Sequence, residues 1–124
     1  MKTGVILFAH GSRDPLWHRP MQAVAQRVAA RWPDTPVRCA YLELTEPDLP
    51  TAASELAALG LASVRIVPMF LGAGRHVRED LPALVQALRQ QHPQLAWELR
   101  PPVGEDERLL DLLADLALGP RTPL

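Results

Sequence analysis

The chain alternates between short apolar runs and longer amphipathic segments. The first apolar run, Gly4–Ala9, is continuous, which is typical of a strand buried on both faces. Similar runs at Val37–Leu42, Val64–Leu71 and Ala96–Arg100 predict three further strands. Because proline cannot donate a hydrogen bond to a ladder, Pro68 should lie near the end of its strand or on an unpaired side.

Between and after these runs, the pattern predicts helices. In the first of them, apolar residues recur at spacings of three and four. It is expected over Leu16–Trp32, and the others over Leu49–Leu59, His76–Gln91 and Glu105–Leu118. Gly60 directly follows the second of these segments and is a plausible C-cap.

Four repeats of strand and helix predict one α/β domain over residues 1–118, with a flexible tail over residues 119–124. Helices of this length between strands imply a parallel sheet with right-handed crossovers. The expected fold class is therefore a small three-layer α/β sandwich around a four-stranded parallel sheet. In such sheets, ligands bind beyond the carboxyl ends of the strands, where the strand order reverses. The loops after the strands are the places to search for a site.

Composition narrows the class of protein. The 124 residues are 48% hydrophobic and 22% charged, which is enough to build the core of one domain. A net charge of −1 argues against binding to nucleic acid or to a membrane surface, and no apolar stretch approaches the ~18 residues of a membrane span. The lone Cys39 excludes an intrachain disulfide and is interpreted as a small core residue, so we expect a cytoplasmic protein. Trp17 and Trp32 could be core or interface residues.

Polar side chains gather where the predicted strands end. His10 follows the first strand, Glu43 and Glu46 follow the second, and Gly72–His76 follows the third. Each has a structural explanation when taken singly: a histidine that caps a strand, solvated charges in a turn, a histidine at a helix N-terminus. Two histidines at matched strand ends favour a shared site. Two imidazoles and one carboxylate leave coordination positions open on a metal ion, which suits exchange or catalysis.

Arginine and glycine residues near these strand ends indicate the kind of ligand. Arg13, Arg75 and Arg78 cluster with the histidines in sequence, and arginine pairs with carboxylate in a bidentate manner, so a carboxylate-rich ligand is expected. The stretch Gly72–Gly74 lacks the Lys-Ser/Thr ending and the glycine spacing of nucleotide loops. Nucleotide binding is therefore not predicted.

Three segments resemble the signature stretches of the class II tetrapyrrole chelatases, and most closely the short, single-lobe sirohydrochlorin cobaltochelatases. They are Ala9–Pro15, Leu42–Pro47 and Pro68–His76, and their order and spacing agree with that family. The resemblance covers the whole chain except the tail. It implies the α/β sandwich already predicted from the pattern.

The resemblance also implies roles for individual residues. His10 and His76 would bind the incoming metal, and His10 would also accept a proton. Glu43 and Glu46 would supply a further contact to substrate or metal, with the choice between them left open. The segment before the second histidine would contact the substrate through Phe70, Leu71, Gly72, Ala73, Gly74 and Arg75.

The activity implied by the resemblance is insertion of Co²⁺ into sirohydrochlorin without ATP, with release of two protons, in cobalamin biosynthesis. The metal is then a substrate, no prosthetic group is expected, and Fe²⁺ or Ni²⁺ is an alternative to Co²⁺. Larger members hold the macrocycle between two lobes, so a single lobe implies a homodimer. Two other readings stay open: a metal or tetrapyrrole carrier without turnover, and an α/β interaction domain whose histidines are structural.

Overall fold

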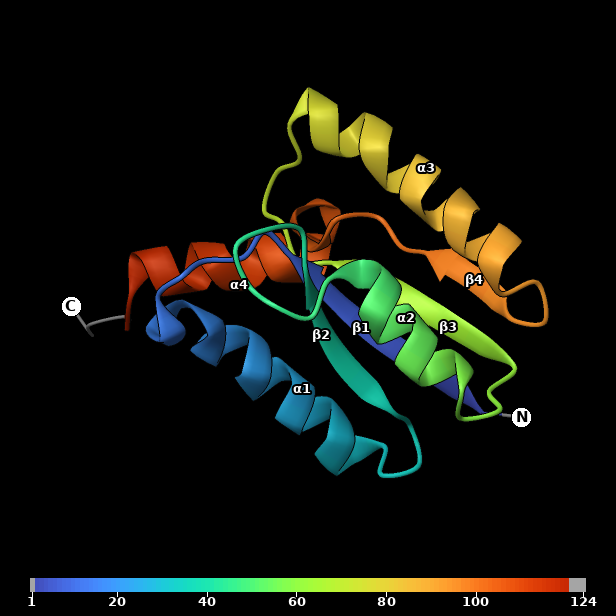
Figure 1. Cartoon of the computed structure of the whole chain (residues 1–124). Coiled ribbons are helices and arrows are strands. Elements are labelled where there is room, and N and C mark those ends of the chain that lie inside the picture. The colour runs from blue at the N-terminus through green and yellow to red at the C-terminus, as the bar shows by residue number, and fades with distance from the viewer. Residues whose placement is uncertain (1, 121–124) are drawn as a thin grey trace.

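The computed structural model describes residues 2–120 and confirms the predicted α/β sandwich (Figure 1). Four parallel strands form one sheet in the order β2-β1-β3-β4. The strands are β1 (Thr3–Ala9), β2 (Val37–Tyr41), β3 (Ser63–Pro68) and β4 (Ala96–Leu99). The helical elements are η1 (Pro15–His18), α1 (Arg19–Arg31), α2 (Leu49–Ala57), α3 (Arg75–Gln91), η2 (Val103–Glu105) and α4 (Glu107–Leu118).

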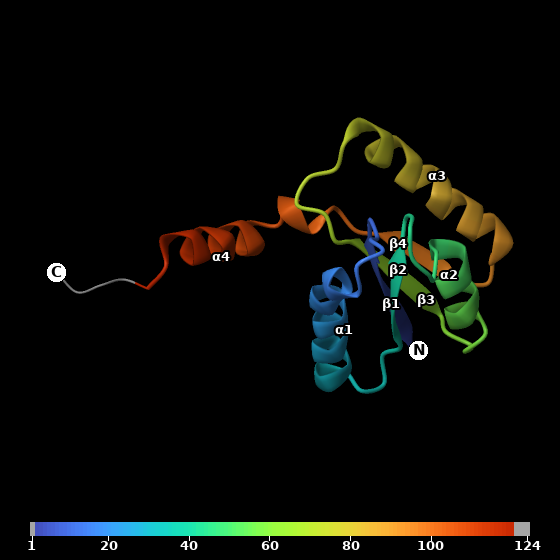
Figure 2. The same ribbon diagram turned by 60° about the vertical axis from the view of Figure 1, so that its left-hand side comes forward.

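The three layers are unequal. Helices α2 and α3 cover one face of the sheet, and α1 alone lies on the other (Figure 2). Because successive strand residues point to opposite faces, Ile6 and Phe8 join the larger core under α2 and α3, whereas Leu7 belongs to a smaller cluster under α1. Cys39 packs against this smaller cluster, which confirms its interpretation as a core residue; burial raises the pKa of its thiol.

Three elements differ clearly from the sequence prediction. Strand β3 ends at Pro68 and not at Leu71, because the last ladder bond on that side is made by the backbone N–H of Met69 to the carbonyl of Phe8, after which the chain leaves the sheet. The predicted first helix is divided: η1 comes first, with Asp14 as its N-cap, and α1 begins at Arg19. The predicted last helix likewise begins later, at Glu107, after the short turn η2.

Helix α4 does not form part of a layer. It projects away from the sheet (Figures 1 and 2), packs against the neighbouring turn η2, and contains no buried residue. Gly119 ends it with a φ of 71°. The rest of the predicted flexible tail beyond Pro120 lies outside the described residues, and the predicted domain boundary at residue 118 stays a prediction. Across residues 2–120, no helix combines the length and the apolar character needed to cross a membrane.

Candidate functional site at the carboxyl edge of the sheet

The strand order places a switch point between β1 and β3. The chain leaves β1 toward β2 on one side and later returns to β3 on the other, so the loops after β1 and β3 diverge from neighbouring strands. His10 follows β1, and Phe70 lies just beyond β3. Their ring centroids are 4.5 Å apart with an interplanar angle of 48°. The two loops therefore meet at the position where this class of sheet binds ligands.

Phe70 anchors this contact. Its side chain is only 3% exposed, and its ring meets that of Phe8 edge-on, with centroids 6.2 Å apart. The side of Phe70 that is not taken up by the core supports the imidazole of His10, which is itself exposed. A buried aromatic ring thus holds an exposed imidazole at the edge of the sheet.

The backbone around His10 is fixed by the loop after β2. The N–H of Glu43 donates to the carbonyl of His10 at 2.9 Å, and the N–H of Leu42 donates to the carbonyl of Ala9 at 2.8 Å. Gly11 has a φ of 111°, and a Cβ there would overlap the carbonyl oxygen of Glu43. Glycine is therefore required where the two loops approach each other.

Hydrogen bonds within the loop after β1 fix most of the rest of its conformation. The hydroxyl of Ser12 accepts a hydrogen bond from the N–H of Asp14 at 3.1 Å, and the carboxylate of Asp14 accepts one from the N–H of Leu16 at 2.9 Å. Both side chains hold the turn that starts η1. Arg13 is exposed and forms no ion pair with any other residue between 2 and 120. His10 and Arg13 are thus the two side chains of this loop that remain available to a ligand.

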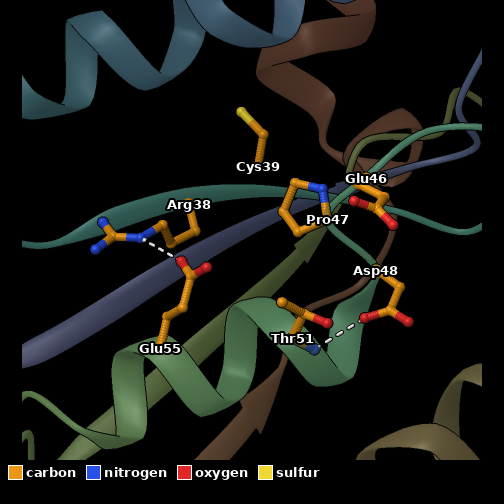
Figure 3. A pocket seen from close by; sticks show the side chains of 7 residues that line it. All are labelled: Arg38, Cys39, Glu46, Pro47, Asp48, Thr51 and Glu55. Carbon is orange, nitrogen blue, oxygen red and sulfur yellow. Dashed lines mark hydrogen bonds and ion pairs between the residues drawn. The ribbon is translucent and has the colours of Figure 1, made fainter.

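The two candidate glutamates lie in different surroundings. Glu43 is exposed and belongs to the tight turn beside His10, where Leu44 has a φ of 65° and the N–H of Thr45 donates to the carbonyl of Glu43 at 2.8 Å. Glu46 lines a hollow between β2 and α2 at the edge of the sheet (Figure 3). The backbone of Glu43 is therefore bonded to that of His10, whereas Glu46 lies in a separate hollow.

Three of the four charged groups that line this hollow, Arg38, Asp48 and Glu55, already have partners. Arg38 pairs with Glu55 at 3.1 Å, and the N–H of Thr51 donates to the carboxylate of Asp48 at 2.9 Å (Figure 3). Hydrogen bonds from Thr51 lower the pKa of the Asp48 carboxyl. These contacts cap α2 and tie it to β2. These contacts indicate that the hollow is a structural feature of the edge strand β2.

His76 lies in the first turn of α3, after Gly74 as N-cap. Its side chain is exposed, as are residues 71–75 apart from the partly covered Ala73, whereas Phe70 is buried. Leu71 is 68% exposed, and Arg75 pairs with Glu79 at 3.1 Å on the solvent side of α3. Figure 1 shows the chain rising from the end of β3 to the start of α3.

No group of three His, Cys, Asp or Glu side chains among residues 2–120 comes close enough to hold a metal ion. The structure thus joins His10, Phe70 and the Glu43 turn, whereas a second ligand from His76 stays a prediction. A metal bound by these two histidines alone would keep most of its coordination positions open.

Gly104 was not indicated by the sequence reading. Its N–H donates to the carbonyl of Phe70 at 3.0 Å, and a Cβ on it would overlap the backbone of Leu71. Turn η2 therefore supports the loop after β3 from behind. A single glycine after two prolines, next to the acidic start of a helix, is the signal that could have marked this close approach.

These features define a parallel α/β domain with an imidazole presented at the switch point of its sheet. The model of the CbiX family matches residues 4–118, so the chain belongs to the CbiX family. It is similar to sirohydrochlorin cobaltochelatase of Methanosarcina acetivorans, at 28% identity over 90% of this chain and 92% of that protein. It is also similar to the protein of that name from Methanothermobacter thermautotrophicus, at 33% identity over 68% of this chain and 58% of that protein.

Solved structures support the same fold. The crystal structure of a CbiX protein of cobalamin biosynthesis from Marinobacter aquaeolei VT8 matches with a TM-score of 0.81 and 33% identity, over 94% of each chain. The sirohydrochlorin chelatase SirB from Bacillus subtilis subspecies spizizenii, solved with cobalt, matches with a TM-score of 0.77 and 24% identity. The alignment covers 92% of this chain but 49% of SirB, so this chain spans about half the length of that relative.

Proposed function

We propose that this chain is a sirohydrochlorin cobaltochelatase, which inserts Co²⁺ into sirohydrochlorin without ATP and releases two protons, in cobalamin biosynthesis. The observation that carries the proposal is the exposed imidazole of His10, supported by Phe70 at the switch point of the sheet in a chain of the CbiX family. Curated relatives that align over most of their length carry this enzyme name.

The chemistry requires a group that both accepts protons and holds a metal ion loosely. Insertion removes two pyrrole N–H protons and strips water from the metal, and an imidazole can do either task at neutral pH. His10 takes the role of proton acceptor and metal ligand, and His76 is the second metal ligand. Nitrogen ligands suit Co²⁺, and equally Fe²⁺ or Ni²⁺, better than Mg²⁺.

The remaining candidate residues contact the macrocycle. Glu43 lies in the turn bonded to His10 and is the better placed of the two glutamates. The exposed Leu71 and the open surroundings of Gly72 and Gly74 leave room for a flat ligand over residues 70–75. Arg75 shares its charge with Glu79 in an exposed pair, which contributes little to stability and can be exchanged for a substrate carboxylate.

A second copy of the chain completes the site. The family relative SirB is about twice as long as this chain, which supports a homodimer in which two single lobes face each other. The macrocycle would then lie between the carboxyl edges of two sheets. We place the reaction in the cytoplasm, because the partly buried Cys39 is the chain's one thiol and fits a reducing compartment.

The test is anaerobic insertion of Co²⁺ into sirohydrochlorin, followed through the visible spectrum against a control without protein. We expect the purified chain to accelerate the reaction, and His10→Ala and His76→Ala to lose at least about 100-fold of that rate, the lower range for a positioned acid–base group. Added imidazole should restore part of the activity of His10→Ala. The matched control is His92→Gln, a histidine at the far end of α3.

The outcomes separate the alternatives. Folded protein that binds Co²⁺ or the macrocycle without accelerating insertion would contradict the enzyme and support a carrier. Alanine variants at His10 and His76 that behave like His92→Gln would contradict the assigned roles. Parallel assays with Fe²⁺ and Ni²⁺ then rank the metals.

A further inference from the structure

A small hollow lies below the first turns of α3, between this helix and the ends of β3 and β4. Figure 1 shows α3 rising away from the sheet toward its N-terminus, and the hollow lies under that part of the helix. Its volume is about 300 Å³. Ligand pockets range from about 300 to 1,000 Å³, so this hollow has room for one part of a large ligand and not for a whole tetrapyrrole.

The walls of the hollow are apolar and held in place by the core. Pro68, at the end of β3, is fully buried, and Leu81 of α3 is 5% exposed. Pro101 and Pro102 line the side next to β4. Proline has a fixed φ and no backbone N–H that a ligand would have to satisfy. The hollow is therefore formed without a ligand, and its walls suit an aliphatic group.

Two arginines border the hollow, and none of the residues that line it is acidic. Arg78, on α3, forms no ion pair with any residue between 2 and 120. Arg100, after β4, has one contact of 3.3 Å with Glu98, whose carboxylate also pairs with Arg65 at 3.0 Å. One carboxylate outside the hollow thus serves two guanidinium groups. The hollow is left with unbalanced positive charge, which a carboxylate from a ligand would neutralise.

The hollow adjoins the candidate site. Ala73, one of the residues proposed to contact the macrocycle, is part of its lining. At its base, Pro68 is separated by one residue from Phe70, which supports the imidazole of His10. A flat ligand that lies over residues 70–75 therefore has one edge next to the hollow.

We propose that this hollow binds one carboxylate-bearing substituent of the tetrapyrrole, with its carboxylate between Arg78 and Arg100 and its methylene groups against Leu81. The inference rests on the proposed function, because it concerns the substrate of the same site. Sirohydrochlorin carries carboxylates on short aliphatic arms around its ring. Such an arm matches both the apolar walls and the two guanidinium groups, whereas a free inorganic anion would match the arginines alone.

The role that follows is one of orientation and selection. A substituent fixed in the hollow sets the rotation of the macrocycle about its own axis above the loop after β3. Arg78 and Arg100 would thus select tetrapyrroles that carry an acidic arm at this position. They act on the binding of the macrocycle and not on the metal ion or on the transfer of protons.

The experiment measures the binding of metal-free sirohydrochlorin to the full chain through its visible absorption, with anaerobic Co²⁺ insertion followed in parallel. We expect Arg78→Gln and Arg100→Gln each to raise the dissociation constant of the tetrapyrrole by about 10-fold, the effect of losing a hydrogen bond between charged groups. The kcat of insertion and the affinity for Co²⁺ alone should stay close to those of the original chain. Arg78→Lys keeps the charge without the forked donors and should be intermediate.

The matched control is Arg27→Gln, which removes the same charge from an exposed position on α1, across the sheet from the hollow. It should bind the tetrapyrrole like the original chain. Added salt should reduce the difference between the original chain and Arg78→Gln, because the lost interaction is between charges near the surface.

The outcomes separate this subsite from the proposed function. Unchanged affinity in both glutamine variants, an equal loss in Arg27→Gln, or a lower kcat at unchanged tetrapyrrole affinity would each overturn the subsite. Normal insertion that depends on neither arginine would contradict the subsite alone. Binding that depends on the arginines, without insertion, would contradict the enzyme alone and support the subsite. A chain that binds no tetrapyrrole would overturn both.

Discussion

The two faces of the sheet are formed by the same strands, but helices cover them to different extents. On one face, α2 and α3 close a core in which Ile6, Leu56 and Ile66 are fully buried. On the other, α1 covers β1 and β2, and residues such as Val5 and Val67 stay partly exposed. The closed face holds the chain together as a domain. The open face has apolar surface left over, which a domain uses for assembly.

The last helix, α4, differs from the other three in its position relative to the sheet. Three helices return to the sheet after short connections, and the fourth leaves it after a turn anchored on the loop behind His10. The support of the candidate site and the departure of α4 therefore share one element, η2. Stability, assembly and the site can be tested separately by changing leucines and glycines on the two sides.

The largest contrast is expected between two leucines. Leu88→Ala, in α3 on the closed face, removes a side chain that is 2% exposed and should lower the free energy of unfolding by about 2–5 kcal/mol. Leu116→Ala, in α4, should change it by less than about 0.5 kcal/mol at protein concentrations where the chain is monomeric. Urea titrations of both variants measure the difference.

At higher concentration, Leu116→Ala should weaken the part of the stability that rises with protein concentration, whereas Leu88→Ala should leave that part in place. Equal losses for the two variants in the monomer would mean that α4 packs on its own sheet, contrary to Figure 2.

A smaller contrast is expected between two glycines of the same region. Gly104→Ala forces a Cβ into the backbone of Leu71, which cannot move aside as a side chain could, and should cost about 1–3 kcal/mol. Gly72→Ala meets nothing within 4 Å and should be close to neutral. Thermal unfolding followed by circular dichroism compares them. Equal midpoints would show that η2 is not pinned to the loop.

The fold was largely readable from the sequence because its helices and strands differ in hydrophobic period. Runs such as Gly4–Ala9 are apolar throughout, since parallel strands are buried on both faces. Pro68 was correctly expected near a strand end, but the apolar residues after it extended the predicted strand too far; Phe70 is buried without being in the sheet. A helix was also predicted in the region of α4, yet the sequence pattern does not show whether another element covers its leucines.

The site was readable in part. His10 could be placed at a strand end from its apolar run, and the contact with Phe70 follows from the strand order, which the sequence pattern does not contain. The surroundings of Glu43 and Glu46 depend on the path of one turn, whose conformation includes Leu44 at positive φ. The support from Gly104 joins residues far apart in the chain, and a local pattern does not encode it.

The smallest expected effect is a difference between the N-termini of α4 and α2 in their sensitivity to low pH. Hydrogen bonds from Arg108 hold the pKa of Asp106, the N-cap of α4, at about 2, below the value of roughly 3.9 for a free aspartate. A lowered pKa stabilises the folded helix above the free value, and that contribution is lost as pH falls from about 4 toward 2. Asp48 caps α2 in the same way, but α2 is also held by buried Leu49 and Leu56.

Acidification should therefore loosen the start of α4 before that of α2. Amide hydrogen exchange at pH 5 and pH 3 measures this by residue, and the protection of α4 should fall more than that of α2. Asp106→Asn keeps the cap but cannot titrate, so it should remove the extra loss in α4. If the variant and the original chain lose protection in α4 equally, the helix does not depend on the charge of its cap. The orientation of α4 would then be determined by turn η2 alone.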